Sequence, residues 1–272
     1  MPDNDSERTN LIHLQREIWN SIYNLSQTLT EDEWTYETDC PGWSVKDCFS
    51  HLIGIEHRLL GRPVGCTDLE ESAHVKNELG RRNEIDILLR RKVSSESLVE
   101  EFNEVNSERL KILLKEVDFS KSVETPIGPG SLKDLVTMRV FDCWVHEQDI
   151  RRAVGRRGNL SSPVALHCLL YVKNFMPYVV GKKAKIPESK TILFKISDQT
   201  IESFSIGVRE GRAIFLEGDS RPDTSIETSV DVFLMLACGR KKINHILEND
   251  NISIHGDRDL GIRVASEIPI IS

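Results

Sequence analysis

The spacing of apolar residues changes character in the stretch KKAKIPESK, residues 182–190. Before it, apolar residues recur at steps of three and four, the period of amphipathic α-helices. After it, they fall in short runs that are typical of strands, TILFKIS, SFSIGV and AIFLEG. This pattern predicts an α+β protein, with a helical bundle over residues 1–183 and a small α+β domain over residues 184–272.

Five helical patterns are expected in the first part of the chain. They cover residues 11–29, 45–60, 95–117, 132–154 and 163–181. Ser44 and Ser131 each precede an aspartate by three residues, which is the capping-box spacing at a helix start. Residues 61–93 are charged and expected to be largely loop, and ETPIGPGS is expected to be a loop because of its prolines and glycines. Long helices joined by such loops indicate an antiparallel bundle.

The second part is expected to contain one helix and a fourth strand besides the three apolar runs. The helix covers residues 229–238, and the strand is the run ISIHG, residues 252–256. Gly211 and Arg212 are expected to form the turn between the second and third strands.

Charge and hydropathy limit the partners. The net charge of −8 disfavours nucleic acid, because phosphate binding needs a basic surface. No stretch holds the roughly 18 to 20 continuous apolar residues of a membrane span. The first ten residues, MPDNDSERTN, have no apolar core of a signal peptide. We therefore expect a cytoplasmic protein that binds neither nucleic acid nor membrane; the sequence does not indicate an oligomeric state.

The cysteines are expected to be free thiols, because no two of them form a C-x-x-C pair. They are Cys40, Cys48, Cys66, Cys143, Cys168 and Cys238. Cys40 lies in the turn TDCPGW and is the one whose position would suit a chemical role, although a structural cysteine is the commoner case.

The segment FDCWVHEQDI places Asp142, His146 and Asp149 at offsets of four and three, on one face of a helix. An aspartate and a histidine so spaced can ligate one divalent metal, with a third ligand from another helix. His51 is the candidate for that ligand because its neighbours are apolar; His57, with charged neighbours, is the rival. The alternative is a solvated ion pair beside a histidine that is simply hydrogen-bonded in the core.

Two segments resemble the metal-bearing helices of the mycothiol-dependent maleylpyruvate isomerase family. They are TDCPGWSVKDCFSHLIGIEHRLLG and RVFDCWVHEQDIRRAVGRRGNL. This family is part of the DinB-like group of helical-bundle proteins. FLMLACGR and ISIHGDRDLGIRV resemble the family's C-terminal domain, an α+β fold akin to sterol carrier protein. The resemblance extends over about residues 10–272 and implies a DinB-like four-helix bundle followed by a sterol-carrier-protein-like domain.

The resemblance implies site residues. The matching metal ligands are His51, Asp142 and His146, for zinc or for nickel, cobalt, iron or manganese. The family's isomerase pattern has glutamate where this chain has Asp142, which is one methylene shorter. An arginine that the family's C-terminal domain supplies to the active site matches Arg240, in CGRKK, as a catalytic residue. Asp149 or Glu147 is expected to orient a ligand histidine.

The resemblance also implies chemistry, with mycothiol, a low-molecular-weight thiol, as cosubstrate. A thiol on zinc is deprotonated, and its addition to a cis double bond allows rotation before elimination gives the trans isomer. An arginine suits a dicarboxylate substrate because its planar fork meets a carboxylate with two hydrogen bonds.

Three alternatives stay open at this point. The first is a thiol S-transferase of the same fold, acting in detoxification. The second is a non-catalytic metal- or lipid-binding protein, since the C-terminal domain resembles a lipid carrier. The third is a metal-sensing regulator that works by protein contact.

Overall fold

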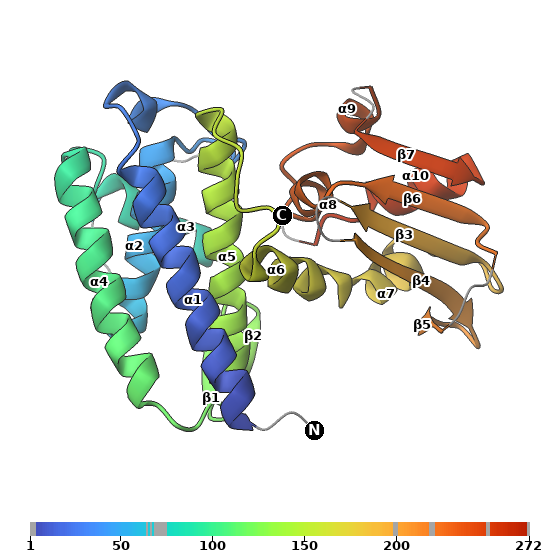
Figure 1. Ribbon diagram of the computed structural model, residues 1–272, viewed down its shortest axis with the longest axis horizontal. Coiled ribbons are helices and arrows are strands. Elements are labelled where there is room, and N and C mark those ends of the chain that lie inside the picture. The colour runs from blue at the N-terminus through green and yellow to red at the C-terminus, as the bar shows by residue number, and fades with distance from the viewer. Residues whose placement is uncertain are drawn as a thin grey trace. The chain divides into compact units, whose positions relative to one another are not determined.

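The structure is a computed structural model that describes residues 4–63, 65, 67, 75–197, 201–217, 221–248 and 251–270. Its contacts divide the chain into two compact units, Met1–Gly158 and Asn159–Ser272. The first unit is helical and the second contains a five-stranded sheet (Figure 1). The predicted α+β class is therefore confirmed.

The first unit is the predicted helical bundle. Its four long helices are α1 (Asn4–Ser26), α2 (Val45–Leu59), α4 (Ser95–Lys115) and α5 (Leu132–Ala153) (Figure 1). Helix α1 packs against α4 and α5, and α2 packs against the same two helices. The largest fully buried side chains between them include Trp144, Phe49 and Phe102. Burial of such aromatic side chains contributes a large share of the stability of a bundle core.

Both predicted capping boxes form, and they fix where the two site-bearing helices begin. The backbone N–H of Asp47 donates to Oγ of Ser44 at 3.2 Å, and the N–H of Ser44 donates to Oδ2 of Asp47 at 3.0 Å. Ser131 and Asp134 form the same reciprocal pair at the start of α5. These bonds satisfy N–H groups that the first helical turn leaves without partners.

Two segments that were expected to be loops contain regular structure. Helix α3 (Glu78–Leu88) forms within residues 61–93, beside α2. Its buried acidic side chains Glu84 and Asp86 are bound by Trp43 and Arg58 from other parts of the bundle. These tertiary contacts stabilise a helix in a segment whose charged sequence is typical of a loop. ETPIGPGS contributes to a hairpin of β1 (Ser122–Thr125) and β2 (Gly128–Ser131), because Gly128 adopts a φ of +111° at its turn. Cys66 lies outside the described residues.

The sheet of the second unit has the strand order β5-β4-β3-β6-β7. The strands are β3 (Thr191–Ser197), β4 (Ile201–Arg209), β5 (Arg212–Leu216), β6 (Thr224–Thr228) and β7 (Ile252–Gly256). β3 and β6 are parallel, and the other neighbouring pairs are antiparallel. Glu210 and Gly211, both at positive φ, make the tight turn between β4 and β5. Arg212, expected in that turn, is the first residue of β5.

Within the described part of residues 191–270, three helices lie between or after the strands. Helix α8 (Val230–Ala237) is the predicted one, whereas α9 (Ile243–Glu248) and α10 (Arg258–Ser266) were not predicted, and neither was β6. Phe194 on β3 stacks on Phe204 at 4.9 Å between ring centroids and contacts Phe233 of α8 edge-on at 6.3 Å. These aromatic contacts form the centre of the second unit's core.

The helical stretch after residue 162 differs from the single helix expected over residues 163–181. It consists of α6 (Pro163–Lys173), a short α7 (Met176–Tyr178) and a π-helical turn, η2 (Val179–Lys183). Helix α6 packs against α8, and η2 packs against β5, so contacts group this stretch with the second unit. The predicted domain boundary after residue 183 instead grouped it with the bundle.

By length and composition, the stretch Pro163–Lys183 is also long and apolar enough to cross a membrane, which the sequence analysis did not anticipate. A core helix of a folded domain passes the same test. Val164, Cys168 and Val172 on this stretch are buried inside the protein, as in a core helix.

Candidate metal centre

The structure brings the three predicted ligands together between α2 and α5. His51 lies in the second turn of α2, and Asp142 and His146 lie one turn apart on α5. One ligand atom from each residue lies within 4.8 Å of the other two. Nε2 of His51 is 3.4 Å from Oδ2 of Asp142, and Nε2 of His146 is 3.7 Å from Oδ1 of the same carboxylate.

The two histidines are buried without the hydrogen bonds that buried rings normally make. His51 is 3% exposed and His146 is 5% exposed. Both ring nitrogens of His51, and Nδ1 of His146, have no hydrogen-bond partner. Each such buried group costs about 1 to 3 kcal/mol unless a ligand satisfies it. The donor chemistry and the missing partners therefore fit a bound cation.

The spacing of the ligand atoms agrees with that fit. Zinc bonds of about 2.0 to 2.2 Å to nitrogen and oxygen place two ligand atoms on adjacent corners of a tetrahedron about 3.3 to 3.6 Å apart. The distance from Asp142 to His51, 3.4 Å, lies in this range, and the distance to His146, 3.7 Å, is slightly longer; both are too long for good hydrogen bonds. Within the described residues the group has three members, the number that catalytic zinc sites use.

Protonation also suits ligation. Burial lowers the pKa of His51 to about 4, so its ring is neutral at neutral pH. Desolvation would raise the pKa of Asp142, but its interactions with His51 and Arg139 outweigh that effect, and the pKa falls well below its usual range. A neutral imidazole and an ionised carboxylate are the forms that bind metal.

Arg139 and Glu56 hold the carboxylate of Asp142 in place. Nη1 of Arg139 donates to Oδ2 of Asp142 at 2.5 Å, one turn away on α5. Nε and Nη2 of Arg139 donate to Oε1 of Glu56 on α2, at 2.9 and 2.8 Å. Oε2 of Glu56 lies 3.6 Å from Nε of Arg109 on α4. Sequence reasoning missed this buried network; the spacing of three residues between Arg139 and Asp142 was its only signal.

Trp43 covers the two histidines. Its ring centroid is 4.8 Å from that of His51 and 5.5 Å from that of His146. Nε1 of Trp43 donates to Oε2 of Glu84 on α3 at 3.2 Å, which fixes the orientation of the indole. From sequence, Trp43 is expected to be a packing anchor, and its contact with the histidines was missed; its position directly before the capped start of α2 was the available signal.

Of the two acids considered for orienting a histidine, Asp149 is placed to do so. Its Oδ2 is 3.3 Å from Nδ1 of His146, and its Oδ1 accepts from Arg152 at 2.7 Å. Glu147 points elsewhere and accepts from Ser21 of α1 and from Arg151.

The remaining candidates, His57 and Arg240, are not members of this group. His57 is bound between Glu101 and Arg62, with Nε2 2.8 Å from Oε1 of Glu101. Arg240 belongs to the second unit and follows α8, where its Nη1 donates to the carbonyl oxygen of Cys238 at 3.4 Å. Its catalytic role stays a prediction.

Comparison with known proteins agrees with this architecture. The sequence profile of the mycothiol maleylpyruvate isomerase N-terminal domain matches residues 15–151, about half of the chain. A sequence comparison with curated proteins finds no significant match.

Among solved structures, a mycothiol-dependent maleylpyruvate isomerase matches with a TM-score of 0.54 and 14% sequence identity, over 91% of this chain and 92% of that chain. A mutant of that isomerase matches with a TM-score of 0.53, the same identity and the same coverage. Sterol carrier protein 2 like 2 from Aedes aegypti matches with 15% identity and a TM-score of 0.30, over 36% of this chain and 93% of that chain. The likeness to the isomerase shows a shared fold.

Proposed function

Because this chain belongs to the mycothiol maleylpyruvate isomerase family, we propose that it is a metal-dependent enzyme that uses a low-molecular-weight thiol, such as mycothiol, as cosubstrate. The reaction is the cis–trans isomerisation of an activated double bond by reversible addition of the thiolate. His51, Asp142 and His146 are the metal ligands, with zinc or another divalent ion. The observation that carries the proposal is the pair of buried histidines whose ring nitrogens lack partners beside one carboxylate.

The ligand set suits thiol chemistry. A divalent cation held by these residues would bind the thiol and lower its pKa, so that the nucleophilic thiolate is present at neutral pH. As ligands, two imidazoles and one carboxylate contribute a single negative charge. A divalent cation bound by them would keep a net positive charge, which favours an anionic ligand such as a thiolate. Asp142 is one-third exposed while both histidines are buried, so solvent and cosubstrate reach the site from its side.

The surrounding side chains keep the ligands in position. Arg139 and Glu56 fix the carboxylate of Asp142, which compensates for its short side chain. Oδ2 of Asp149 lies 3.3 Å from Nδ1 of His146, where it can accept a hydrogen bond from the ring after a small shift. Trp43 shields both imidazoles from water, and a drier site strengthens the interactions of its charged groups.

Arg240 is proposed to bind a carboxylate of the substrate, since its guanidinium can form two parallel hydrogen bonds with it. Replacing Arg240 with Ala should raise KM for a dicarboxylate substrate more than replacing it with Lys. Lys241→Ala is the matched control, because it removes a neighbouring positive charge and leaves the guanidinium.

The second candidate is a thiol S-transferase. It stays a candidate because this chain has Asp142 where the family's isomerase pattern has glutamate. The two reactions differ in the fate of the thiol, because an isomerase regenerates it and a transferase consumes it. We would incubate the metal-loaded protein with mycothiol and a cis-dicarboxylate, or with an electrophile, and measure free thiol and product together. Formation of product at an unchanged concentration of free thiol supports the isomerase. Loss of one free thiol for each product molecule formed supports the transferase. Neither reaction in the loaded protein would contradict the proposed enzyme.

In keeping with its family and charge, we propose a cytoplasmic enzyme whose partners are small molecules.

A further inference from the structure

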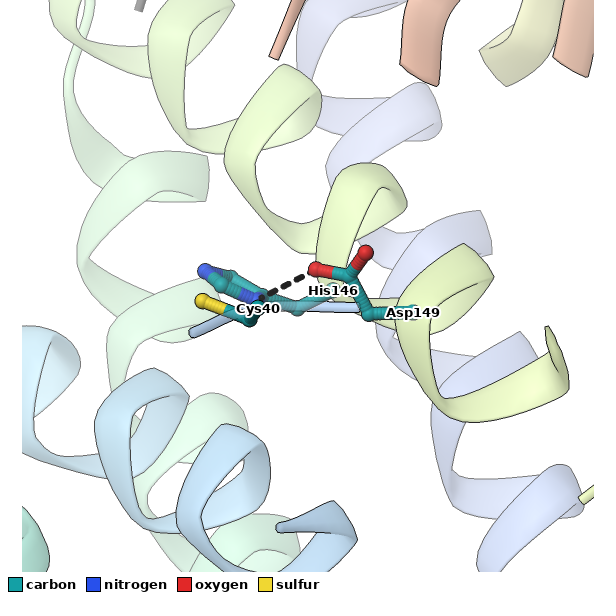
Figure 2. A group of neighbouring side chains, drawn as sticks. All are labelled: Cys40, His146 and Asp149. Carbon is teal, nitrogen blue, oxygen red and sulfur yellow. Dashed lines mark ion pairs between the residues drawn. The ribbon is translucent and has the colours of Figure 1, made fainter. Parts of the chain in front are cut away.

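A second group of metal-binding side chains shares His146 with the first group and includes Asp149, whose Oδ2 is 3.3 Å from Nδ1 of the ring. Figure 2 shows it: Cys40 comes from the loop before α2, and Asp149 comes from α5, one turn after His146. One ligand atom of each residue lies within 4.8 Å of the other two. All three residues are buried, with Cys40 9% exposed, His146 5% exposed and Asp149 fully buried.

The His146 ring itself points to a ligand here. Its Nδ1 is buried and has no hydrogen-bond partner, although Oδ2 of Asp149 is only 3.3 Å away. That distance is long for a charge-assisted hydrogen bond, which is typically about 2.7 to 2.9 Å. It equals the separation of about 3.3 Å expected for two atoms that ligate one tetrahedral zinc ion.

The loop that carries Cys40 is held from both ends. The backbone N–H of Cys40 donates to Oγ1 of Thr38 at 3.2 Å, and its carbonyl accepts from the N–H of Trp43 at 3.1 Å. The preceding Asp39 accepts from Nε of Arg152 at 2.8 Å, and Nη2 of Arg152 donates to Asp149. Arg152 therefore ties the loop to the helix that carries the other two residues, so the three side chains stay close together.

The charge and the chemical softness of the ligand atoms indicate which metal ion this group would bind. A thiolate and a carboxylate together neutralise a divalent cation, which matters for a group that is entirely buried. Sulfur is a soft ligand that favours zinc and similar thiophilic ions, whereas His51, Asp142 and His146 offer only nitrogen and oxygen. The two groups would therefore differ in metal preference.

We propose that Cys40, His146 and Asp149 form a second cation site, for a thiophilic divalent ion, on the Nδ1 side of the His146 ring. Binding releases the thiol proton of Cys40 to solvent. A neutral imidazole has one lone pair for ligation, so a cation at Nδ1 removes His146 from the centre that it shares with His51 and Asp142. Occupation of the second site then inhibits the enzyme. Only this competition rests on the proposed function; the site itself does not.

The test is a titration of the reduced full-length protein with cobalt(II) alone, followed by absorption spectroscopy. A thiolate ligand gives a charge-transfer band in the near ultraviolet, and a nitrogen–oxygen site gives none. We expect one cobalt ion per chain with a partial band in the wild type and a stronger band in Asp142→Asn. Cys40→Ala should lose the band and keep its cobalt. Cys48→Ala, which removes a buried thiol beside the same loop, is the matched control and should behave as the wild type.

Three results would overturn the inference. If neither the wild type nor Asp142→Asn shows the charge-transfer band, there is no second site. If the band survives in Cys40→Ala, the thiolate ligand is not Cys40. Two cobalt ions per chain contradict the shared ligand. A band that Asp142→Asn leaves unchanged supports the second site but contradicts the competition and the first centre. If Cys40→Ala does not fold by circular dichroism, cadmium NMR of the wild type decides, because its chemical shift reports whether sulfur is a ligand.

Discussion

Arg139 donates to Asp142 across one turn of α5 while its other nitrogens donate to Glu56 on α2. A single buried guanidinium thus joins the proposed metal ligand to the neighbouring helix. Arg139 is 4% exposed and Glu56 is 1% exposed, so neither charge has water as an alternative partner. Loss of Arg139 leaves Glu56 with Arg109 at 3.6 Å, and loss of Glu56 leaves Arg139 with Asp142. Removing one partner of a buried charge pair typically costs about 3 to 5 kcal/mol.

This pairing predicts non-additive stability effects. Arg139→Met and Glu56→Met should each lower the free energy of unfolding by about 3 to 5 kcal/mol. The double variant should lose at least about 1 kcal/mol less than the two single losses together, because it leaves no unpaired partner in this pair. Urea unfolding of the four proteins measures the coupling. Additive losses would contradict a direct charge pair.

Gly54 on α2 predicts a steric effect at the contact with α3. A Cβ at this position would lie 2.4 Å from Cβ of Asp86, whose carboxylate is paired with Arg58. Gly54→Ala should therefore destabilise the protein by about 1 to 3 kcal/mol, although alanine is the better helix former.

The control for Gly54 is Gly80 on α3, where the nearest atom to an added Cβ is 3.5 Å away. Gly80→Ala should be neutral or stabilising by up to about 1 kcal/mol. Thermal unfolding compares the two variants, and equal effects would count against the close approach of α2 and α3 at Gly54.

Glu101 on α4 predicts a pH-dependent contribution to stability. Burial would raise the pKa of Glu101, but its bonds to Arg90 and His57 outweigh burial and hold the pKa below the ordinary value of 4.5. A carboxyl group with a lowered pKa in the folded state stabilises the protein above its unfolded pKa, and this stability is lost as the pH falls through the folded pKa.

The stability difference between wild type and Glu101→Gln should therefore be about 1 kcal/mol at neutral pH and shrink below about pH 4.5. Urea unfolding at a series of pH values measures it. Glu104→Gln, at an exposed position on the same helix, should show no such trend. A difference that grows on acidification would contradict the assignment.

Trp43 predicts an optical signal of metal binding. Its indole contacts both histidines of the proposed centre. Cobalt(II) held by these residues should quench the fluorescence of the protein, and Trp43→Phe should reduce the quenching while the bound cobalt stays the same. Unchanged quenching in Trp43→Phe would show that the ion binds elsewhere.

Much of the fold could be predicted because helix caps and the spacing of apolar residues are recorded in short stretches of sequence. Ser44 and Ser131 mark the starts of α2 and α5 by the spacing of their caps alone. Helix α3 could not be predicted in this way, since ion pairs such as Arg58 with Asp86 exist only after the chain folds. The run TSIET of β6 is short and rich in polar residues, and its pairing with β3 and β7 makes it a strand.

The candidate site likewise contains residues that local sequence predicts and residues that only the tertiary structure reveals. Asp142 and His146 share a helix face by spacing, which sequence reveals directly. His51 required an inward-facing position and a family resemblance, because nothing local relates α2 to α5. Contacts of Arg139 and Trp43 with the site depend on how neighbouring elements are rotated against each other, and no local pattern encodes that rotation.

The most direct test of the central claim is the metal content of the purified protein beside His51→Ala, His146→Ala and His57→Ala. His57 is the matched control, since it lies on α2 with His51 but is bound by Glu101 and Arg62. After loading with zinc and removal of the excess, we expect about one zinc ion per chain in the wild type and in His57→Ala. His146→Ala should lose it, and His51→Ala should lose it once Cys40→Ala also removes the second proposed site, while these variants remain folded. A wild type without metal, or zinc retained in both His146→Ala and the double variant, would contradict the proposed metal centre.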